Sequence, residues 1–393
     1  MNTAGPPPCH PTRSPNTYVG TDLFVVSPLL HMWGQTFHVS ISTAGLAVTA
    51  FAVAYVLGAP FLGGLADRLS RRKILLFALL SFALANLITA LTPWFSLLIV
   101  ARLAAGLSVA GTTPSVYALV SENSPNGRRA AWLGITTSGL LSALWAGAPL
   151  GDLAAAHFGW RAVFFTLVAA AASVMVVNRV IWAERPTPDT GTEQRATTLR
   201  RARAVSTTTL WAAGVYGLYT YLVSGLHAEG WGTNLTAAAL AVYGVCAVAG
   251  SLFGGRVADH SHPLRMVTTG LASLAVALVM VGLVVRESVP LTLAALGVMA
   301  LAAYPVFPAQ QAELLRCFPP AESARILAWN QSAMYVGIAA GSLFGGAVIS
   351  GPGFGFLPFI CAAVALMGVA ASRVATRIPA QSHAETPNKV DAA

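Results

Sequence analysis

The stretch GGLADRLSRRK, from Gly63 to Lys73, decides the class of this fold. Five of its eleven residues are charged, whereas only 9% of the whole 393-residue chain is charged. A soluble domain carries about a quarter charged residues, so this chain lacks the charge to cover a surface that faces water. With 55% hydrophobic residues and a mean hydropathy of +0.67, its composition suits a lipid bilayer.

Apolar segments long enough to cross about 30 Å of hydrocarbon flank this loop and recur along the chain. Because a backbone in lipid must satisfy its own hydrogen bonds, each is expected to be a helix. The predicted spans are 43–66, 74–91, 95–119, 130–156, 162–182, 206–228, 235–258, 266–285, 290–313, 325–349 and 356–375.

A twelfth, shorter apolar segment comes first, from Thr17 to Trp33. As a helix it would reach only about 25 Å at 1.5 Å per residue, so we expect a truncated first span. The proline-rich residues 1–16 are expected to be non-helical. One interpretation is that these residues come from a misassigned start. The other is a genuine half-helix, partly unwound, that neighbouring helices bury.

The basic residues predict an orientation. If the loop at 63–73 lies inside, 20 of the 23 lysines and arginines fall on that side. Both termini are then expected in the cytoplasm, and the chain in the cell membrane. The formal charge of +9 is explained in this way, so nucleic acid is not an expected partner. The four cysteines are far apart and form no CxxC pair, which favours apolar packing over disulfides or a metal.

The sequence also divides into two related halves. A polar linker at 184–205 separates six spans in 17–183 from six in 206–375, and a cytoplasmic tail follows at 376–393. Asp67 and Asp259 each end the second span of a half, as G-x-x-x-D, 192 residues apart. We therefore predict an all-α integral membrane protein of two pseudo-symmetric six-helix bundles, which is the architecture of a secondary transporter.

These residues resemble the major facilitator superfamily, in particular its twelve-helix, proton-coupled efflux branch of drug, sugar and nucleoside exporters. The opening loop is similar to the family signature G-x-x-x-D-R-x-G-R-[RK], with Ser70 at a usual glycine. The resemblance implies a gating motif that holds the cytoplasmic side closed while the cavity faces outward. Its residues here are Gly63, Asp67, Arg68, Arg71 and Arg72, with Asp259 as a weaker counterpart in the second half.

Three other stretches resemble the same family more loosely. GTDLFVVSPLL, residues 20–30, looks like the first helix of exporters, with His31 where a second proline often stands. AGAPLG, residues 146–151, is similar to the glycine–proline motif of exporter helix 5, with Asp152 at a usual glycine. Arg102 and Gly106 look like the buried-arginine motif of helix 4.

Small residues at four-residue spacing predict close helix packing in the spans 130–156 and 325–349. The residues of this packing motif are Gly147, Pro149, Gly151, Gly341 and Gly345.

Few charges fall at membrane depth, where each costs at least about 2.5–3.5 kcal/mol and is by default a functional candidate. Asp22 is predicted to be a proton-accepting carboxylate facing the central cavity; the alternative is an N-terminal helix cap. Arg102 is predicted either to tune Asp22 or bind an anionic substrate, or to form a structural salt bridge or reach the interface. Asp152 and Glu313, near helix ends, are expected to be solvated.

Aromatic and amide side chains are candidates for the substrate cavity, although interfacial belts and core packing explain many of them equally well. The candidates in the predicted spans 290–313 and 325–349 are Tyr304, Gln310, Asn330 and Gln331.

The resemblance implies a secondary active transporter that exports a small organic solute, such as a drug, nucleoside or sugar, by proton antiport and alternating access. The alternatives are a proton-coupled uptake permease of the same fold, and a defective homologue without a complete first helix. An embedded enzyme is not expected, because no HExxH, GxSxG or clustered His/Asp set occurs in or near a span. We expect a proton gradient as the energy source, no cofactor or metal, and a monomer.

Overall fold

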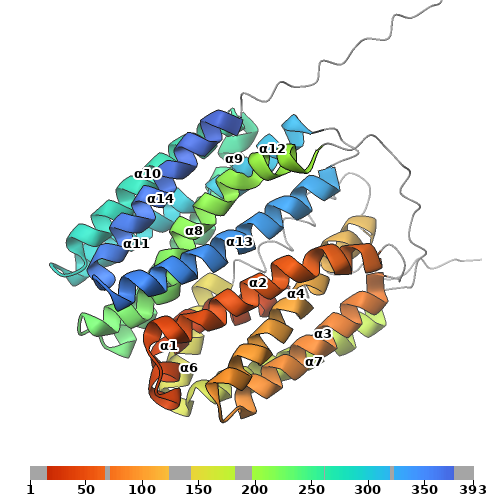
Figure 1. Ribbon diagram of the computed structural model, residues 1–393, viewed down its shortest axis with the longest axis horizontal. Coiled ribbons are helices and arrows are strands. Elements are labelled where there is room, and N and C mark those ends of the chain that lie inside the picture. Colours follow the sequence, from red (N-terminus) through yellow and green to blue (C-terminus); the bar gives the residue numbers. More distant parts are fainter. Residues whose placement is uncertain are drawn as a thin grey trace, which may run out of the picture.

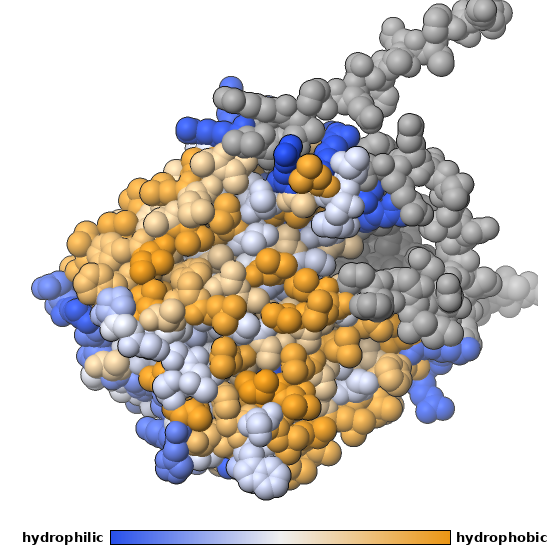
Figure 2. All heavy atoms as spheres, viewed as in Figure 1, coloured by the Kyte–Doolittle hydropathy of each residue, from blue (hydrophilic) through white to orange (hydrophobic). Residues whose placement is uncertain are grey.

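The computed structural model describes residues 16–66, 71–123, 143–181, 197–260, 262–318 and 323–375, and every regular element in those ranges is a helix. Nine helices in this part of the chain are long and apolar enough to cross a membrane. Figure 2 shows hydrophobic residues over the middle of the molecule and hydrophilic residues towards the two ends of the helices. The predicted all-α membrane fold is confirmed.

The helices form two groups that follow the two halves of the sequence (Figure 1). The first half contains α1 (Asn16–Phe37), α2 (Ile41–Ala66), α3 (Arg71–Leu91), α4 (Phe95–Asn123), the π-helical turn η2 (Ala143–Gly147), α6 (Ala148–Phe158) and α7 (Trp160–Ile181). The second contains α8 (Thr198–Ala228), α9 (Thr233–His260), α10 (Pro263–Val284), α11 (Val289–Ala303), α12 (Val306–Cys317), α13 (Ser323–Ser350), the short η4 (Phe354–Phe356) and α14 (Leu357–Ala375).

Helix α1 is longer than its apolar stretch predicts. It continues beyond Trp33 to Phe37, so its 22 residues reach about 33 Å, enough for the hydrocarbon core. The expected end at Trp33 is therefore one turn too early. The helix ends where His38 takes a left-handed conformation, φ 55°, and the Val39 N–H donates to the Gly34 carbonyl at 3.1 Å. This is a Schellman motif, which closes a helix through backbone geometry rather than through hydropathy.

Two other boundaries differ from the apolar pattern. Helix α8 begins at Thr198, inside the segment 184–205 predicted as a linker, and the Thr197 side chain caps it by accepting from the Arg200 N–H. The predicted span 290–313 is interrupted between α11 and α12, where Pro305 removes a backbone donor. The indole N–H of Trp211 donates to the Ala303 carbonyl at this break, at 2.8 Å.

Among the described residues, the two halves meet mainly where α2 packs on α13, where α9 packs on η2 and α6, and where α1 packs on α8. Several of their polar contacts lie at the end of the bundle formed by the α1–α2 and α8–α9 connections, which we call the α1–α2 end. There the Ser342 hydroxyl donates to the Gly45 carbonyl at 2.8 Å, and the Ser350 hydroxyl donates to Ser42 at 2.7 Å. The structure is therefore closed at the α1–α2 end.

Candidate functional site

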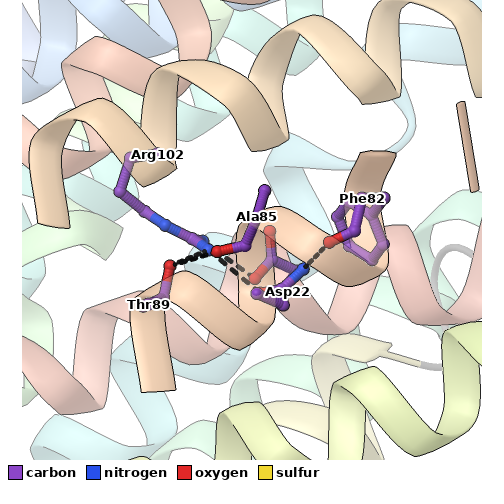
Figure 3. Close-up of polar contacts among 6 residues, drawn as sticks. Asp22, Phe82, Ala85, Thr89 and Arg102 are labelled. Atoms are coloured by element: carbon purple, nitrogen blue, oxygen red, sulfur yellow. Dashed lines mark hydrogen bonds and ion pairs between the residues drawn. The ribbon is translucent and has the colours of Figure 1, made fainter. Parts of the chain in front are cut away.

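A buried ion pair lies inside the first half. Arg102 of α4 donates from Nη1 to Oδ1 of Asp22 in α1 at 2.8 Å. The two side chains are 1% and 0% exposed, so neither charge reaches solvent or lipid headgroups. Figure 3 shows the guanidinium extending from α4 towards Asp22 and Thr89. Burial of a charge is tolerated when it is paired and hydrogen-bonded, and here both conditions are met.

Two polar residues of α3 complete the surroundings of the guanidinium. Arg102 Nη2 donates to Asn86 Oδ1 and to Thr89 Oγ1, both at 2.9 Å. Their own hydrogens go to backbone carbonyls one turn earlier, Asn86 to Phe82 at 3.0 Å and Thr89 to Ala85 at 2.9 Å. The acceptor atoms are thereby held towards Arg102, so the guanidinium has two hydrogen-bond acceptors besides Asp22.

The pair is not saturated. Among the described residues, Asp22 Oδ2 and Arg102 Nε have no hydrogen-bond partner. The guanidinium also lies over the ring of Phe164 in α7, 5.0 Å from its centroid. The carboxylate thus keeps one free oxygen that can accept a proton without displacing an existing donor.

The sequence singled out Asp22 and Arg102, but it did not single out Asn86 and Thr89. These two polar residues are three positions apart in the span 74–91, where the only other polar residue is Ser81, so they share one helix face. That spacing is the signal that would have found them.

An aromatic cluster that includes Phe24 of α1 joins the two halves. Phe24, two residues after Asp22, stacks on Tyr216 of α8 with ring centroids 6.1 Å apart and meets Tyr219 edge-on at 5.7 Å. Tyr219 also contacts Tyr243 of α9, and Tyr243 contacts Tyr304 at the α11–α12 break. All five side chains are buried. We call Phe24, Tyr216, Tyr219, Tyr243 and Tyr304 the aromatic cluster.

Of the four predicted cavity residues, Tyr304 lies in the aromatic cluster, and two others make separate contacts with α8. Gln310 donates to the Ala204 carbonyl at 2.9 Å, and Asn330 accepts from Thr208 at 2.5 Å. Gln331 is half-buried. Gln310 and Asn330 therefore contact α8 one turn apart, and the assignment of the four residues to a substrate cavity stays a prediction.

The predicted gating motif is described only in part. Asp67 and Arg68 lie outside the described residues, and the structure describes Gly63, Arg71 and Asp259 as helical without describing their side chains. Arg72 donates to the Arg179 carbonyl of α7 at 2.6 Å, which joins α3 to the end of α7.

The packing motif lies at close helix contacts. A Cβ at Gly151 would collide with Val25 of α1, and one at Gly341 would come within 2.8 Å of the Ala213 carbonyl of α8. At Gly345 it would come within 2.8 Å of the Tyr221 ring. Gly147 ends η2, and Pro149 follows in the first turn of α6, where the π-helical turn passes into the α-helix.

The expectation that Asp152 is solvated is wrong. Its side chain is fully buried and accepts a hydrogen bond from the Thr236 hydroxyl of α9 at 3.0 Å. The reason is tertiary: α9 covers the face of α6 on which Asp152 lies, so a residue near a helix end is still enclosed by the second half. Glu313, by contrast, is 13% exposed and pairs with Arg316 at 3.6 Å.

Comparison with known proteins places this arrangement in a family. The family model described as Major Facilitator Superfamily matches residues 17–238 and 205–391. The chain is 26% identical to the uncharacterized MFS-type transporter YbcL of Bacillus subtilis, over 90% of this chain and 92% of that protein. It is 30% identical to a chloramphenicol resistance protein of Streptomyces lividans, over 62% of this chain and 64% of that one.

A solved structure shows the same fold. The crystal structure of a D-xylose–proton symporter superposes with a TM-score of 0.78 at 14% identity, covering 94% of this chain and 97% of that one. The chain thus belongs to the Major Facilitator Superfamily, as a multi-pass membrane transporter of small molecules and not an enzyme.

Proposed function

We propose that this transporter exports a small organic solute, such as a drug, a nucleoside or a sugar-like compound, in exchange for protons by alternating access. The observation that carries the proposal is the buried Asp22–Arg102 pair. An ionisable pair in the interior of a membrane protein is expensive to maintain and marks an ion or proton pathway.

The geometry supports a role for Asp22 as the proton acceptor. A proton on its free oxygen would remove the negative charge and weaken the contact with Nη1 of Arg102. Arg102 would keep its hydrogen bonds to Asn86 and Thr89, so the site would gain a net positive charge without collapsing. Protonation therefore changes the charge of the site while leaving its frame in place, which is what a coupling site requires.

The aromatic cluster is the proposed place of substrate contact. It shares α1 with Asp22 through Phe24, and it contains side chains from both halves. Tyrosine rings present flat apolar faces together with hydroxyl groups, which suits solutes that have both a ring and polar substituents. Because the cluster lies between the halves, a solute bound there would be exposed alternately on either side as the halves rock.

One further observation supports export, and a second supports the orientation of the chain in the cell membrane. One relative of this chain is a chloramphenicol resistance protein, and drug export is one way in which a transporter can give resistance. The arginine-rich start of α8, with Arg200, Arg201 and Arg203, lies at the end opposite the α1–α2 end, as expected if that opposite end faces the cytoplasm. Both termini are then cytoplasmic.

The test is transport in everted membrane vesicles with an imposed proton gradient, with chloramphenicol, uridine and xylose as probes. Wild-type protein should accumulate at least one probe against its gradient. Asp22→Asn, which permanently resembles the protonated form, should still exchange that probe passively but lose uphill transport and its dependence on pH. Asp22→Glu, which keeps the carboxyl group, should retain partial coupling.

Full gradient-driven accumulation by Asp22→Asn would remove Asp22 from the coupling mechanism. Accumulation only in right-side-out vesicles with an inward proton gradient would instead identify an uptake permease. That outcome would overturn the direction proposed here.

A further inference from the structure

A second group of titratable side chains lies at the α1–α2 end, apart from the Asp22–Arg102 pair. It contains His31 of α1, Asp152 of α6 and His227 of α8, with Thr236 of α9 beside them. Asp152 accepts from the Thr236 hydroxyl at 3.0 Å, and the rings of His31 and His227 have centroids 4.5 Å apart. We call His31, Asp152 and His227 the junction cluster, because each contact joins the first half to the second.

The junction cluster is partly enclosed, because Asp152 is fully buried while His31 and His227 are half-buried, and it is incompletely hydrogen-bonded. Asp152 is fully buried, and in the described part of the chain its Oδ1 has no hydrogen-bond partner. His227 Nδ1 lies 2.8 Å from the Trp231 carbonyl, while its Nε2 is buried and unpartnered among the same residues. His227 also acts electrostatically on both His31 and Asp152, which links the two contacts into one group.

The other groups packed around the junction cluster do not balance its charge. Tyr219 of α8 interacts electrostatically with Asp152 but is a neutral phenol at ordinary pH. Glu229, at the end of α8, is paired with Arg286 at 2.9 Å. Arg161, at the start of α7, lies over the Trp160 ring and donates to the Thr92 carbonyl. No three His, Cys, Asp or Glu side chains in the described ranges are grouped to hold a metal ion.

Burial restricts the number of protons that the closed cluster can hold. An uncompensated charge on or beside the fully buried Asp152 is costly, so the favoured closed state is neutral overall. One carboxylate and two imidazoles are neutral together when they share one proton, either on Asp152 or on one of the histidines. Two imidazolium rings 4.5 Å apart would repel each other and leave a net positive charge, and an ionised Asp152 beside two neutral rings would leave a buried negative charge.

We propose that His31, Asp152 and His227 form a second proton-binding site, which takes up one shared proton when the two halves close at the α1–α2 end and releases it when they separate. The inference rests on the alternating access of the proposed function, but it does not depend on Asp22 or on the direction of transport. It assigns a role to the contact between Asp152 and Thr236, which must break whenever α6 and α9 move apart.

The proposal predicts that the ratio of closed to open molecules passes through a maximum as the pH is varied. In the open state the groups are hydrated, and with ordinary pKa values of about 3.9 for Asp and 6.5 for His they bind no proton above about pH 8 and two near pH 5. The closed cluster holds one proton. Closure therefore takes up one proton from solution at high pH, where the open cluster holds none, and releases one at low pH, where the open cluster holds two. The ratio should peak near about pH 6.5 and fall on each side, approaching tenfold per pH unit.

The experiment measures the distance between spin labels on the two halves by double electron–electron resonance in lipid nanodiscs, without substrate. The labels replace Phe158 at the end of α6 and Asn234 at the start of α9, both exposed, in a chain whose four cysteines are changed to alanine. The populations of the short and long distances are followed from pH 5 to pH 9. The wild-type background should give the peaked curve.

The curve has an acid limb, where the ratio falls below the peak pH, and an alkaline limb, where it falls above the peak pH. Two variants test these limbs separately. Asp152→Asn makes the closed cluster neutral with no proton, so the ratio should become flat above about pH 7.5 while the acid limb remains. His227→Gln leaves one imidazole, so the open state binds only one proton near pH 5, and the acid limb should flatten while the alkaline limb remains. His157→Gln, which changes an exposed histidine of α6 at the same end, should leave the curve unchanged.

A wild-type ratio that is independent of pH, or an alkaline limb that persists in Asp152→Asn, would overturn the proposal. If Asp152→Asn does not fold, the acid limb in His227→Gln decides the question by itself. Asp22→Asn should keep the peaked curve. Failure of Asp22 as the coupling site in the vesicle experiment would therefore be recognised separately from failure of the junction cluster.

Discussion

Asp22 and Arg102 are 80 positions apart in the sequence, yet Oδ1 of one lies 2.8 Å from Nη1 of the other. Both belong to the first half, as do Asn86 and Thr89, which hold the guanidinium. In the proposed cycle this pair moves as one body with its half. The contact of Asp152 with Thr236 instead crosses between the halves and must break when they separate. The same motion therefore leaves the ion pair intact but breaks the contact between Asp152 and Thr236.

From the buried ion pair we predict that a single substitution lowers the free energy of unfolding much more than a double substitution that removes both charges. Arg102→Ala leaves a buried, unpaired Asp22 and should lower the free energy of unfolding by about 3–5 kcal/mol. Asp22→Leu/Arg102→Met, which replaces both charges by apolar groups, should recover most of that stability while abolishing gradient-driven transport. Unfolding of the purified protein in detergent is the measurement. An Arg102→Ala protein as stable as wild type would contradict a structural contribution from the pair.

The stability of Arg102→Ala should also depend on pH. Without the guanidinium, burial favours the uncharged carboxyl group, so protonation of Asp22 relieves the defect. The difference in unfolding free energy from wild type should shrink as the pH falls and grow as it rises. Arg102→Ala/Asp22→Asn should show no such dependence, which makes the double variant the control.

Gly106 predicts a steric limit inside α4. A Cβ at this position would collide with the backbone carbonyl of Phe51 in α2, which has little freedom to move away. Gly106→Ala should therefore destabilise the protein by about 1–3 kcal/mol, despite the better helix propensity of alanine. Gly111→Ala in the same helix meets only side-chain carbons at 3.3 Å or more and should change stability by less than about 1 kcal/mol. Equal thermal stability of the two variants would contradict the packing argument.

The hydrogen bond from Ser342 to the Gly45 carbonyl predicts a shift in the balance between conformations. It joins α13 to α2 at 2.8 Å and is available only when the α1–α2 end is closed. Ser342→Ala should lose about 1 kcal/mol of this closure and lower the closed-to-open ratio about fivefold. The same spin-label distances report the ratio. Ser173→Ala, which removes an exposed hydroxyl bonded only within α7, should leave it unchanged.

The gating motif gives a prediction from sequence alone, because Asp67 lies outside the described residues. Asp67→Asn removes a charge that is expected to pair with basic residues near the cytoplasmic surface, while every orienting arginine remains. Membrane insertion should be normal and turnover should fall about tenfold, as expected for the loss of one charge-assisted hydrogen bond. Asp259→Asn should have a smaller effect, since its loop carries fewer basic residues. Normal transport by Asp67→Asn at normal expression would contradict the role of Asp67 in the gating motif.

The helices were predictable because the bilayer imposes a length and an apolar composition on each span, and both can be read locally. Their ends were less so. The end of α1 depends on the left-handed conformation of His38, and the break in the span 290–313 depends on Pro305 and on a donor from Trp211 in another helix. These are features of backbone geometry and of neighbours distant in sequence, to which an average hydropathy is insensitive.

By itself, the sequence determined that the chain is a helical membrane protein of two halves. It also determined that Asp22 and Arg102 are costly charges at membrane depth, and therefore functional candidates. It also marked His31 and Asp152 as unusual residues in their motifs, but only singly. The tertiary structure decided that Asp22 and Arg102 meet, and that Asp152 is enclosed by α9 and interacts with His227 beside His31. The physical reason is that hydropathy acts on each helix separately, whereas the partner of a buried charge is chosen by how the helices pack.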